Sequence, residues 1–437
     1  MGSACYSSAR PCDASYRRVD RRNARTSHPQ HCAKPAAALG RQAWQSVEPR
    51  SSHDGGEDRA LKIIDVASRL YHIPPTVSWE DATHRVANLE FIITRVTTDA
   101  GIVGEGFAYT TGIGGSAILA LIDDYCRTML VGQDPRQIER LWSFLYGQLH
   151  RSGTGGINTL ALGAIDIALW DIAAKWYDVP LFRLLGARRD NIPTYGSGID
   201  LFLDSDALLN QVDGLLAAGH KAVKIKIGRD NAEEDLDRIV AVKKLIGPTR
   251  RLFVDANQRW NVSDCMIRLQ KLAAFDLGWI EEPLHAEDIC GHADLRGFVA
   301  LPIAVGESLY TRHQFADYLQ ANAVDVVQAD VCRVGGISEW LKIANLSASF
   351  HRPMAPHYMS ELSVAVMCAI DNADILECVH GGSFSEMGVL QTALRLENGV
   401  AFPFEAPGHG VVFDHEKLEP FAVDPAVLRT RNLQSAK

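Results

Sequence analysis

The order of apolar and polar positions divides the chain at about residue 186. Before this point, short alternating segments predict strands of a small antiparallel sheet, because successive strand residues face opposite sides. These segments cover residues 61–66, 89–96 and 103–108. Apolar residues then recur with helical spacing over residues 115–130, 136–149 and 157–178. Residues 61–186 are therefore predicted to form an α+β domain.

After Gly186 the pattern changes to short apolar runs separated by longer amphipathic stretches. The eight runs are residues 192–195, 222–227, 251–254, 277–280, 303–305, 324–328, 353–355 and 375–376. Strands that alternate with helices form parallel sheets, and eight βα repeats suit a closed barrel. The pattern predicts an α/β fold with a TIM-like barrel, while an open doubly wound sheet remains an alternative.

An ionisable residue lies at or just beyond the end of each of seven successive strand-like runs. These residues are Lys226, Asp255, Glu281, Glu307, Asp330, His357 and Glu377. Successive members are separated by about the length of one βα unit. The carboxyl ends of barrel strands meet at one mouth, where active sites lie. The seven side chains are therefore predicted to converge at that mouth.

Three of these residues, Asp255, Glu281 and Glu307, are carboxylates on successive strands. Three convergent anions repel one another in a poorly solvated pocket unless a cation lies between them. Hard oxygen ligands suit Mg²⁺. Alternatively, each acid caps the helix that follows it, which explains one residue better than three in phase. The sequence thus predicts a Mg²⁺ site.

Two further pairs indicate acid–base chemistry. Lys224 and Lys226 lie two residues apart on one strand and so share a face, where two ammonium groups would depress each other's pKa. A neutral lysine could then act as a base; a solvated outer face is the alternative. Asp330 and His357 end adjacent strands, so the carboxylate is expected to orient the imidazole and raise its pKa.

Taken together, these motifs resemble the mandelate racemase subgroup of the enolase superfamily. The matching segments are residues 222–228, 254–258, 279–284, 305–307, 330–336 and 355–357, with Glu377. The resemblance covers about residues 61–425. It implies an α+β capping domain over 61–186 and a modified (β/α)7β barrel over 187–400. A C-terminal segment, 401–437, is expected to return to the cap.

The resemblance also implies a role for each polar residue. Asp255, Glu281 and Glu307 would bind Mg²⁺; Lys226 would be one base, with Lys224 as its electrostatic helper; Asp330 and His357 would form the second acid/base on the opposite face; and Glu377 would hydrogen-bond the substrate carboxylate. Asp330 and His357 are typical of racemases and sugar-acid dehydratases and not of muconate lactonizing enzymes, according to the resemblance. The residues around His357 and Glu377 favour the dehydratases.

The predicted function is therefore that of a lyase, a Mg²⁺-dependent sugar-acid dehydratase. It would remove the proton next to a carboxylate and eliminate the 3-hydroxyl, giving a 2-keto-3-deoxy acid. Racemization or epimerization of a 2-hydroxy acid on the same site is the first alternative. A non-catalytic binding protein is the second. A third is a dinucleotide-binding protein, because residues 112–117 (GIGGSA) approach a glycine-rich fingerprint.

Substrate specificity is expected to come from the cap. The segments at residues 71–85 and 109–116 could close over the barrel mouth. Trp79, His84 and Arg85 are candidates to meet a distal substrate group, with exposed loop residues as the alternative reading. Asn257, which follows Asp255 in the matching motif, is a further candidate for substrate binding.

Charge and composition argue against two classes of partner. The 437 residues carry a net charge of −9, yet residues 1–50 hold nine basic and three acidic residues. The acidic remainder argues against nucleic acid, and no apolar run suggests a membrane partner. Nine scattered cysteines without a Cys-x-x-Cys pair favour a reducing, cytoplasmic location.

Residues 1–60 are predicted to be a solvated tail, with a transit peptide or basic arm as alternatives. The expected partners are a small-molecule carboxylate and further copies of the chain in a homo-oligomer.

Overall fold

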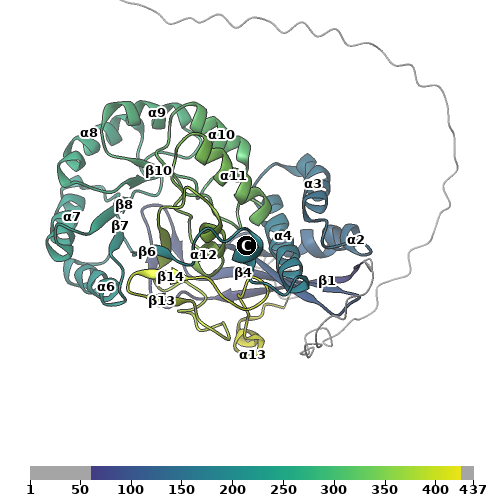
Figure 1. Cartoon of the computed structure of the whole chain (residues 1–437). Helices are drawn as coiled ribbons and strands as arrows, with labels where there is room; N and C mark the ends of the chain where they lie inside the picture. Colours follow the sequence, from purple (N-terminus) through teal and green to yellow (C-terminus); the bar gives the residue numbers. More distant parts are fainter. Residues whose placement is uncertain (1–60, 425–437) are drawn as a thin grey trace, which may run out of the picture. The chain divides into compact units, whose positions relative to one another are not determined.

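The computed structural model describes residues 61–424 (Figure 1). The predicted leader over residues 1–60 and the chain end from residue 425 lie outside the described residues. The first described region contains a three-stranded antiparallel sheet in the order β1-β4-β5. Its strands are β1 (Ile63–Ile73), β4 (Leu89–Thr98) and β5 (Val103–Thr110). The predicted sheet is confirmed, and β1 is longer than its alternating segment suggested.

This antiparallel sheet excludes one alternative from the sequence. The glycine-rich segment at residues 112–117 follows β5, which is an edge strand paired antiparallel with β4. A dinucleotide fingerprint instead needs a parallel βαβ unit, in which the strand leads to a helix whose N-terminus holds the pyrophosphate. The dinucleotide-binding reading was therefore wrong.

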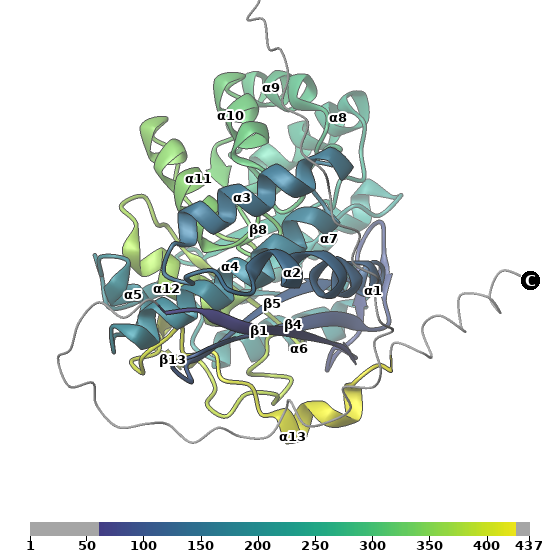
Figure 2. The same cartoon turned by 90° about the vertical axis from the view of Figure 1, so that its right-hand side faces the viewer.

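Helices cover one face of the sheet, and α4 lies along it (Figure 2). The helices of this region are α1 (Gly115–Leu121), α2 (Arg127–Leu130), α3 (Ile138–Leu149), α4 (Ile157–Trp176) and α5 (Leu181–Leu184). A π-turn at Ile122–Cys126 divides the first predicted helix into α1 and α2. By length and composition α4 is apolar enough to cross a membrane, which the sequence reading overlooked. However, 83% of its most apolar window is buried inside the protein, so it is a core helix.

The barrel strands form a parallel ring that closes between the last strand and the first. They are β6 (Ile192–Ser197), β7 (Ala222–Lys226), β8 (Arg251–Asp255), β9 (Ile280–Glu281), β10 (Ile303–Val305), β11 (Val326–Val327) and β12 (Leu376–Val379). A bridge residue, Met354, pairs with Val327 and Ala373 and takes the place of the seventh strand. Because β12 pairs parallel with β6, the sheet is a closed barrel and the open doubly wound alternative was wrong.

Helices surround this ring between its strands (Figure 1). They are α6 (Ser205–Ala217), α7 (Ala232–Ile246), α8 (Val262–Leu272), α9 (Ile289–Phe298), α10 (Arg312–Gln320), α11 (Ile337–Ser349) and α12 (Ser360–Ala369). Several begin at a side-chain cap, such as Asn231 before α7 and Asn261 before α8. Such caps fix where these βα loops end.

An apolar layer fills the barrel below its mouth. Tyr195, Phe253 and Trp279 pack against one another there, with the Phe253 and Trp279 rings stacked. Side chains alternate along a strand, so the next inward residues toward the mouth are Lys224 and Lys226 on β7 and Asp255 on β8. The apolar layer therefore lies beneath the polar groups, and its close packing leaves no path for water through the base of the barrel.

The C-terminal segment runs back to the first domain. A hairpin of β13 (Arg395–Glu397) and β14 (Val400–Phe402) joins the barrel sheet through β6. Beyond it, the short helix α13 (His415–Leu418) follows, and His415 Nε2 lies 2.8 Å from Glu105 Oε1 on β5. Ala422 then bridges to Tyr71 on β1. These contacts tie the chain end to the sheet.

Close backbone packing joins the first domain to the barrel. A Cβ atom at Gly104 or Gly106 on β5 would lie about 2 Å from a carbonyl oxygen of α4, 2.2 Å and 2.0 Å respectively. A Cβ at Gly163 on α4 would lie 2.5 Å from the Cys332 oxygen, in the loop after β11. Only glycine permits such approaches. The stack of β5, α4 and this barrel loop is therefore tight.

Candidate active site

Three carboxylates meet at the barrel mouth, as the sequence predicted. Asp255 and Glu281 end β8 and β9, and Glu307 follows β10 by two residues. One oxygen of each lies within 4.8 Å of the others, and Asp255 and Glu281 are fully buried. Neighbouring parallel strands carry these groups to the same height, because Asp255 is paired in register with Glu281. Hard, convergent oxygens of this kind fit a divalent cation.

Both lysines of β7 point into this cluster. Lys224 Nζ lies 2.8 Å from Glu281 Oε1 and 2.7 Å from Glu377 Oε1, while Lys226 Nζ lies 2.6 Å from Asp255 Oδ2. Burial favours neutral amines, yet the surrounding carboxylates raise the pKa of both lysines above the ordinary value. The sequence predicted that repulsion between the two ammonium groups would lower the pKa of both lysines. For the site without a metal ion, that prediction was wrong. Attraction to the acids outweighs the repulsion between the two ammonium groups.

The carboxylates titrate differently according to their neighbours. Burial and the nearby Asp255 raise the pKa of Glu281 to about 8. Burial also opposes ionisation of Asp255 and Glu377, but the lysines prevail: Lys226 lowers the pKa of Asp255, and Lys224 lowers that of Glu377 to about 2. The two lysines thus favour the ionised forms of Asp255 and Glu377, whereas burial and the charge of Asp255 oppose ionisation of Glu281.

Glu377 is held from two sides. Its Oε1 pairs with Lys224, and its Oε2 accepts a hydrogen bond of 2.8 Å from the backbone N–H of Tyr358. An ionised carboxylate accepts hydrogen bonds and cannot donate one. The expected hydrogen bond to a substrate carboxylate stays a prediction, and it needs a proton on Glu377; a substrate hydroxyl suits the ionised form.

Asp330, which is fully buried, and His357, which is partly buried, form a pair on the other side of the triad. His357 Nδ1 lies 2.7 Å from Asp330 Oδ2, and His357 Nε2 lies 3.4 Å from Glu307 Oε2. Burial lowers the pKa of His357, but Glu307 and Asp330 together raise it above the ordinary value. The predicted contact and the predicted direction of the shift are both confirmed. Nε2 is the ring nitrogen turned toward the carboxylate cluster.

A residue from the other domain completes this pair. Tyr109, near the end of β5, places its hydroxyl 2.5 Å from Asp330 Oδ2 and 3.3 Å from His357 Nδ1. In the sequence, Tyr109 is only the first residue of the segment 109–116, which was expected to close over the mouth. The alternation that puts Phe107 and Tyr109 on one face of β5 was visible, but nothing in it pointed to Asp330.

Asn257 and Gln328 lie beside the triad. The Asn257 N–H donates to Asp255 Oδ1 at 2.9 Å, and Gln328 Nε2 donates to Glu281 Oε2 at 2.7 Å. The side-chain oxygens of both are buried without a hydrogen-bond partner among the described residues. Unpaired buried acceptors are costly, so they suit a ligand that donates hydrogen bonds. Sequence reasoning missed Gln328; the role of Asn257 stays a prediction.

The candidate residues of the cap loop have different surroundings. Trp79 begins β2 (Trp79–Glu80); its indole N–H donates to the His380 carbonyl at 3.0 Å, and its ring packs edge-on against Tyr358. His84 and Arg85, at the turn into β3 (Arg85–Val86), have side chains 74% and 80% exposed. Trp79 thus anchors the loop to the barrel, and no contact brings His84 or Arg85 to the triad. Their substrate-binding roles stay predictions.

The hairpin of β2 and β3 nevertheless lies at the barrel mouth. The Leu201 N–H, in the loop after β6, donates to the Glu80 carbonyl at 2.7 Å. A Cβ at Gly228, just beyond β7, would lie 2.9 Å from the Cβ of Ala82 at the hairpin turn. The loop therefore rests on the ends of the first two barrel strands, next to the strand that carries Lys226.

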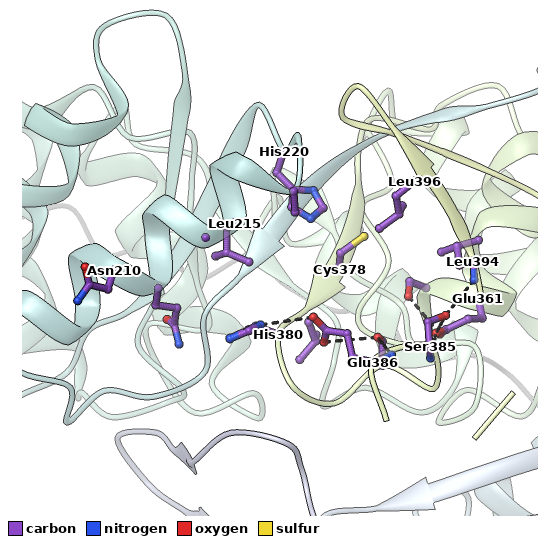
Figure 3. A pocket seen from close by; sticks show the side chains of 16 residues that line it. Asn210, Leu215, His220, Glu361, Cys378, His380, Ser385, Glu386, Leu394 and Leu396 are labelled. Carbon is purple, nitrogen blue, oxygen red and sulfur yellow. Dashed lines mark hydrogen bonds and ion pairs between the residues drawn. The ribbon is translucent and has the colours of Figure 1, made fainter. Parts of the chain in front are cut away.

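A separate cavity of about 290 Å³ opens outside the barrel wall (Figure 3). It lies between α6 and the segment that follows β12, and its lining includes Leu215, His220, Cys378 and His380. None of the triad carboxylates or the β7 lysines lines it. The predicted catalytic residues named here therefore lie at the barrel mouth and do not line this cavity.

Two family models match the chain. The mandelate racemase / muconate lactonizing enzyme N-terminal domain matches residues 64–186, and the enolase C-terminal domain-like model matches residues 207–417. A 3,6-anhydro-α-L-galactonate cycloisomerase of Streptomyces coelicolor is 34% identical over 83% of this chain and 99% of its own length. An L-talarate/galactarate dehydratase of Salmonella typhimurium is 38% identical over 65% of this chain and 71% of its own length.

Solved structures also resemble the fold of this chain. A racemase from Streptomyces coelicolor with bound magnesium superposes with a TM-score of 0.80 at 34% identity, covering 83% of this chain and 100% of that one. An L-talarate dehydratase from Polaromonas complexed with Mg and L-glucarate gives a TM-score of 0.78 at 29% identity, with 83% and 98% coverage. The predicted combination of a cap and a modified barrel is confirmed.

Proposed function

The chain belongs to the mandelate racemase / muconate lactonizing enzyme family of the enolase superfamily, and we propose that it is a Mg²⁺-dependent dehydratase of a sugar acid. One observation supports this proposal: a lysine and a histidine–aspartate pair, each able to serve as a base, lie on the two sides of a carboxylate triad. Lys226 on β7 precedes the strands of the triad, β8 to β10, around the barrel, and the Asp330–His357 pair follows them. Two opposed bases can address both faces of one carbon atom.

Asp255, Glu281 and Glu307 would hold the metal ion. The fit rests on three buried or half-buried oxygens within 4.8 Å of one another and is supported by the magnesium reported in related structures. Bound Mg²⁺ supplies the positive charge that offsets the negative charge developing on a substrate carboxylate when its neighbouring proton leaves. The charge of the ion would also offset the acids that raise the pKa of Lys226, so that this lysine could serve as a base.

The proton transfers then follow from the residues of this chain. Lys226 or His357 removes the proton from C2 of the sugar acid. His357, protonated on Nε2, gives a proton to the 3-hydroxyl as the C3–O bond breaks, so that water leaves and a C2–C3 double bond forms. The resulting enol gains a proton at C3 and loses its own, giving the 2-keto-3-deoxy acid. Lys224 stabilises the developing charge, and Glu377 positions a substrate hydroxyl.

Cycloisomerization is a second candidate, because a relative 34% identical over 83% of the chain carries that name. In a 3,6-anhydro sugar acid the oxygen on C3 belongs to an ether ring. The same proton removal at C2 would then break the ring C3–O bond, and the protonated oxygen would stay in the product. Only the leaving group differs, so one site can serve either reaction.

A substrate screen separates these functions. The protein with Mg²⁺ is incubated in D₂O with a library of sugar monoacids, diacids and anhydro acids, and products are analysed for keto groups, mass and deuterium. A dehydratase gives keto acids that have lost one water. A cycloisomerase gives keto acids that retain all heavy atoms of the substrate and differ in mass only by the deuterium taken up at C3, and an epimerase gives deuterium at C2 without a keto acid; either result, without any dehydration, overturns the main proposal.

Variants of the two bases sharpen the screen. His357→Asn is expected to abolish dehydration and to leave exchange of the C2 proton on the face served by Lys226. Lys226→Gln should lose exchange of the C2 proton on the face served by Lys226 and keep it on the face served by His357, so the two variants should act on opposite C2 epimers. The predicted cytoplasmic location and homo-oligomeric state are not addressed by this experiment and stay predictions.

A further inference from the structure

We propose that Tyr109, supplied by the cap, is a positioning residue for the Asp330–His357 pair. The expected kinetic effect rests on the proposed function, whereas the contacts of Tyr109 are observed independently of any activity. The Tyr109 hydroxyl and His357 Nδ1 both lie within hydrogen-bond distance of the same oxygen, Asp330 Oδ2, at 2.5 Å and 2.7 Å. The acid/base on this face is therefore built from both domains.

The hydrogen bonds to Asp330 can be assigned one by one. Its Oδ1 accepts the backbone N–H groups of Cys332 at 2.8 Å and Arg333 at 3.0 Å. An ionised carboxylate only accepts, so Oδ2 must receive the hydroxyl hydrogen of Tyr109 and the Nδ1 hydrogen of His357. Asp330 is fully buried, and these four donors take the place of water. His357 is thereby held with Nδ1 protonated and Nε2 facing the cluster.

Tyr109 fixes the one oxygen of Asp330 that the backbone does not hold. Without the hydroxyl, Oδ2 would keep only the imidazole as a partner, and the pair would lose a restraint on its orientation. The hydroxyl also draws negative charge from Oδ2, which sets how strongly this oxygen attracts the Nδ1 hydrogen. Tyr109 thus acts on the substrate only through the orientation and hydrogen bonding of His357.

The ring of Tyr109 is itself fixed by packing. It meets the Tyr358 ring edge-on, with centroids 4.9 Å apart, and the Arg333 guanidinium lies 5.4 Å from its centre. On the opposite face of β5, Gly104 and Gly106 press against α4. A phenylalanine would keep this ring packing and remove only the hydroxyl. Tyr109→Phe is therefore a specific test.

A matched control is available in the barrel. Tyr318 is also fully buried, and its hydroxyl donates to the Ala286 carbonyl at 2.7 Å. Tyr318→Phe removes one buried hydroxyl with a short hydrogen bond and a 3.3 Å contact to the Nδ1 of a histidine, His292, as Tyr109→Phe does at His357, but outside the Asp330–His357 pair. A general loss of stability should appear in both variants, and a positioning effect only in the first.

The first measurement does not depend on activity. In protein labelled with ¹⁵N-histidine, the Nδ1–H proton of His357 should give a downfield resonance, identified by its disappearance in His357→Asn. We expect Tyr109→Phe to shift or broaden this resonance beyond detection, while Tyr318→Phe leaves it in place. An unchanged resonance in Tyr109→Phe would overturn the proposal, even if the protein has no activity on sugar acids.

The second measurement uses exchange of the C2 proton on the full-length protein with Mg²⁺. Misplacing a catalytic group costs about 10²-fold in rate, so Tyr109→Phe should lower exchange on the His357 face by about that factor. KM and exchange on the Lys226 face should stay within about twofold of the wild type. Equal loss on both faces, or no loss, refutes the positioning role. Absence of any exchange by the wild type refutes the proposed function instead, and the resonance then decides on Tyr109 alone.

Discussion

The raised pKa of Glu281, which ends β9, leads to a quantitative prediction about metal binding. Two of the clustered carboxylates, held at the outer limit of 4.8 Å, repel by about 3.5 kcal/mol when both are ionised at an effective dielectric constant of about 20. Together with burial, this repulsion raises the pKa of Glu281 to about 8, from an ordinary 4.5. At neutral pH, Glu281 is therefore mostly protonated before the metal binds.

Binding of Mg²⁺ should consequently release a proton. A carboxyl group must ionise to become a ligand, so the apparent affinity falls about tenfold per pH unit below its pKa. The sign is fixed: affinity rises with pH up to about 8 and levels off above it. Between pH 8, where half of the Glu281 side chains are ionised, and pH 6, the predicted loss of affinity is about fiftyfold.

Calorimetric titration with Mg²⁺ tests this directly. Repeating the titration in buffers of different ionisation enthalpy counts the protons released, and about one is expected at pH 6.5. Glu281→Gln cannot ionise and should lose both the proton release and most of the affinity. The matched control is Glu287→Gln, on the same βα loop, where the side chain is 91% exposed. Affinity that is flat from pH 6 to 8, or wild-type binding by Glu281→Gln, would refute the reasoning.

Two further predictions concern the contact between cap and barrel. Burial raises the pKa of Asp166 on α4 to about 7; because this folded value lies above the unfolded one, stability should fall as pH rises from about 4 to 7, by up to about 4 kcal/mol. Asp166→Asn should flatten this dependence in thermal unfolding at pH 5 and 8, and an unchanged pH dependence would contradict it. Gly163→Ala, in the same helix, should destabilise by about 2 kcal/mol despite the better helix propensity of alanine, because its Cβ would meet the Cys332 carbonyl. Gly147→Ala on α3 has open space and should stabilise by about 0.5–1 kcal/mol; the same sign of change in melting temperature for both variants would argue against the close contact.

Local periodicity was sufficient for much of the fold. The eight strand-like runs after Gly186 correspond to seven strands and the bridge at Met354, because buried parallel strands need continuous apolar residues. The convergence of Asp255, Glu281 and Glu307 followed from their common place at strand ends. The π-turn at Ile122–Cys126 could not be predicted, because its residues keep a helical pattern.

The sequence by itself determined which residue types reach the barrel mouth, since strand alternation and the βα repeat are local properties of the chain. Only the tertiary structure decided how these residues act on one another. The pKa values of Lys224 and Lys226 rise because acids from several strands surround them, a sum of charges that no single strand reveals. Tyr109 reaches Asp330 across 221 positions of the sequence, because packing of the cap on the barrel, and no local pattern, brings them together.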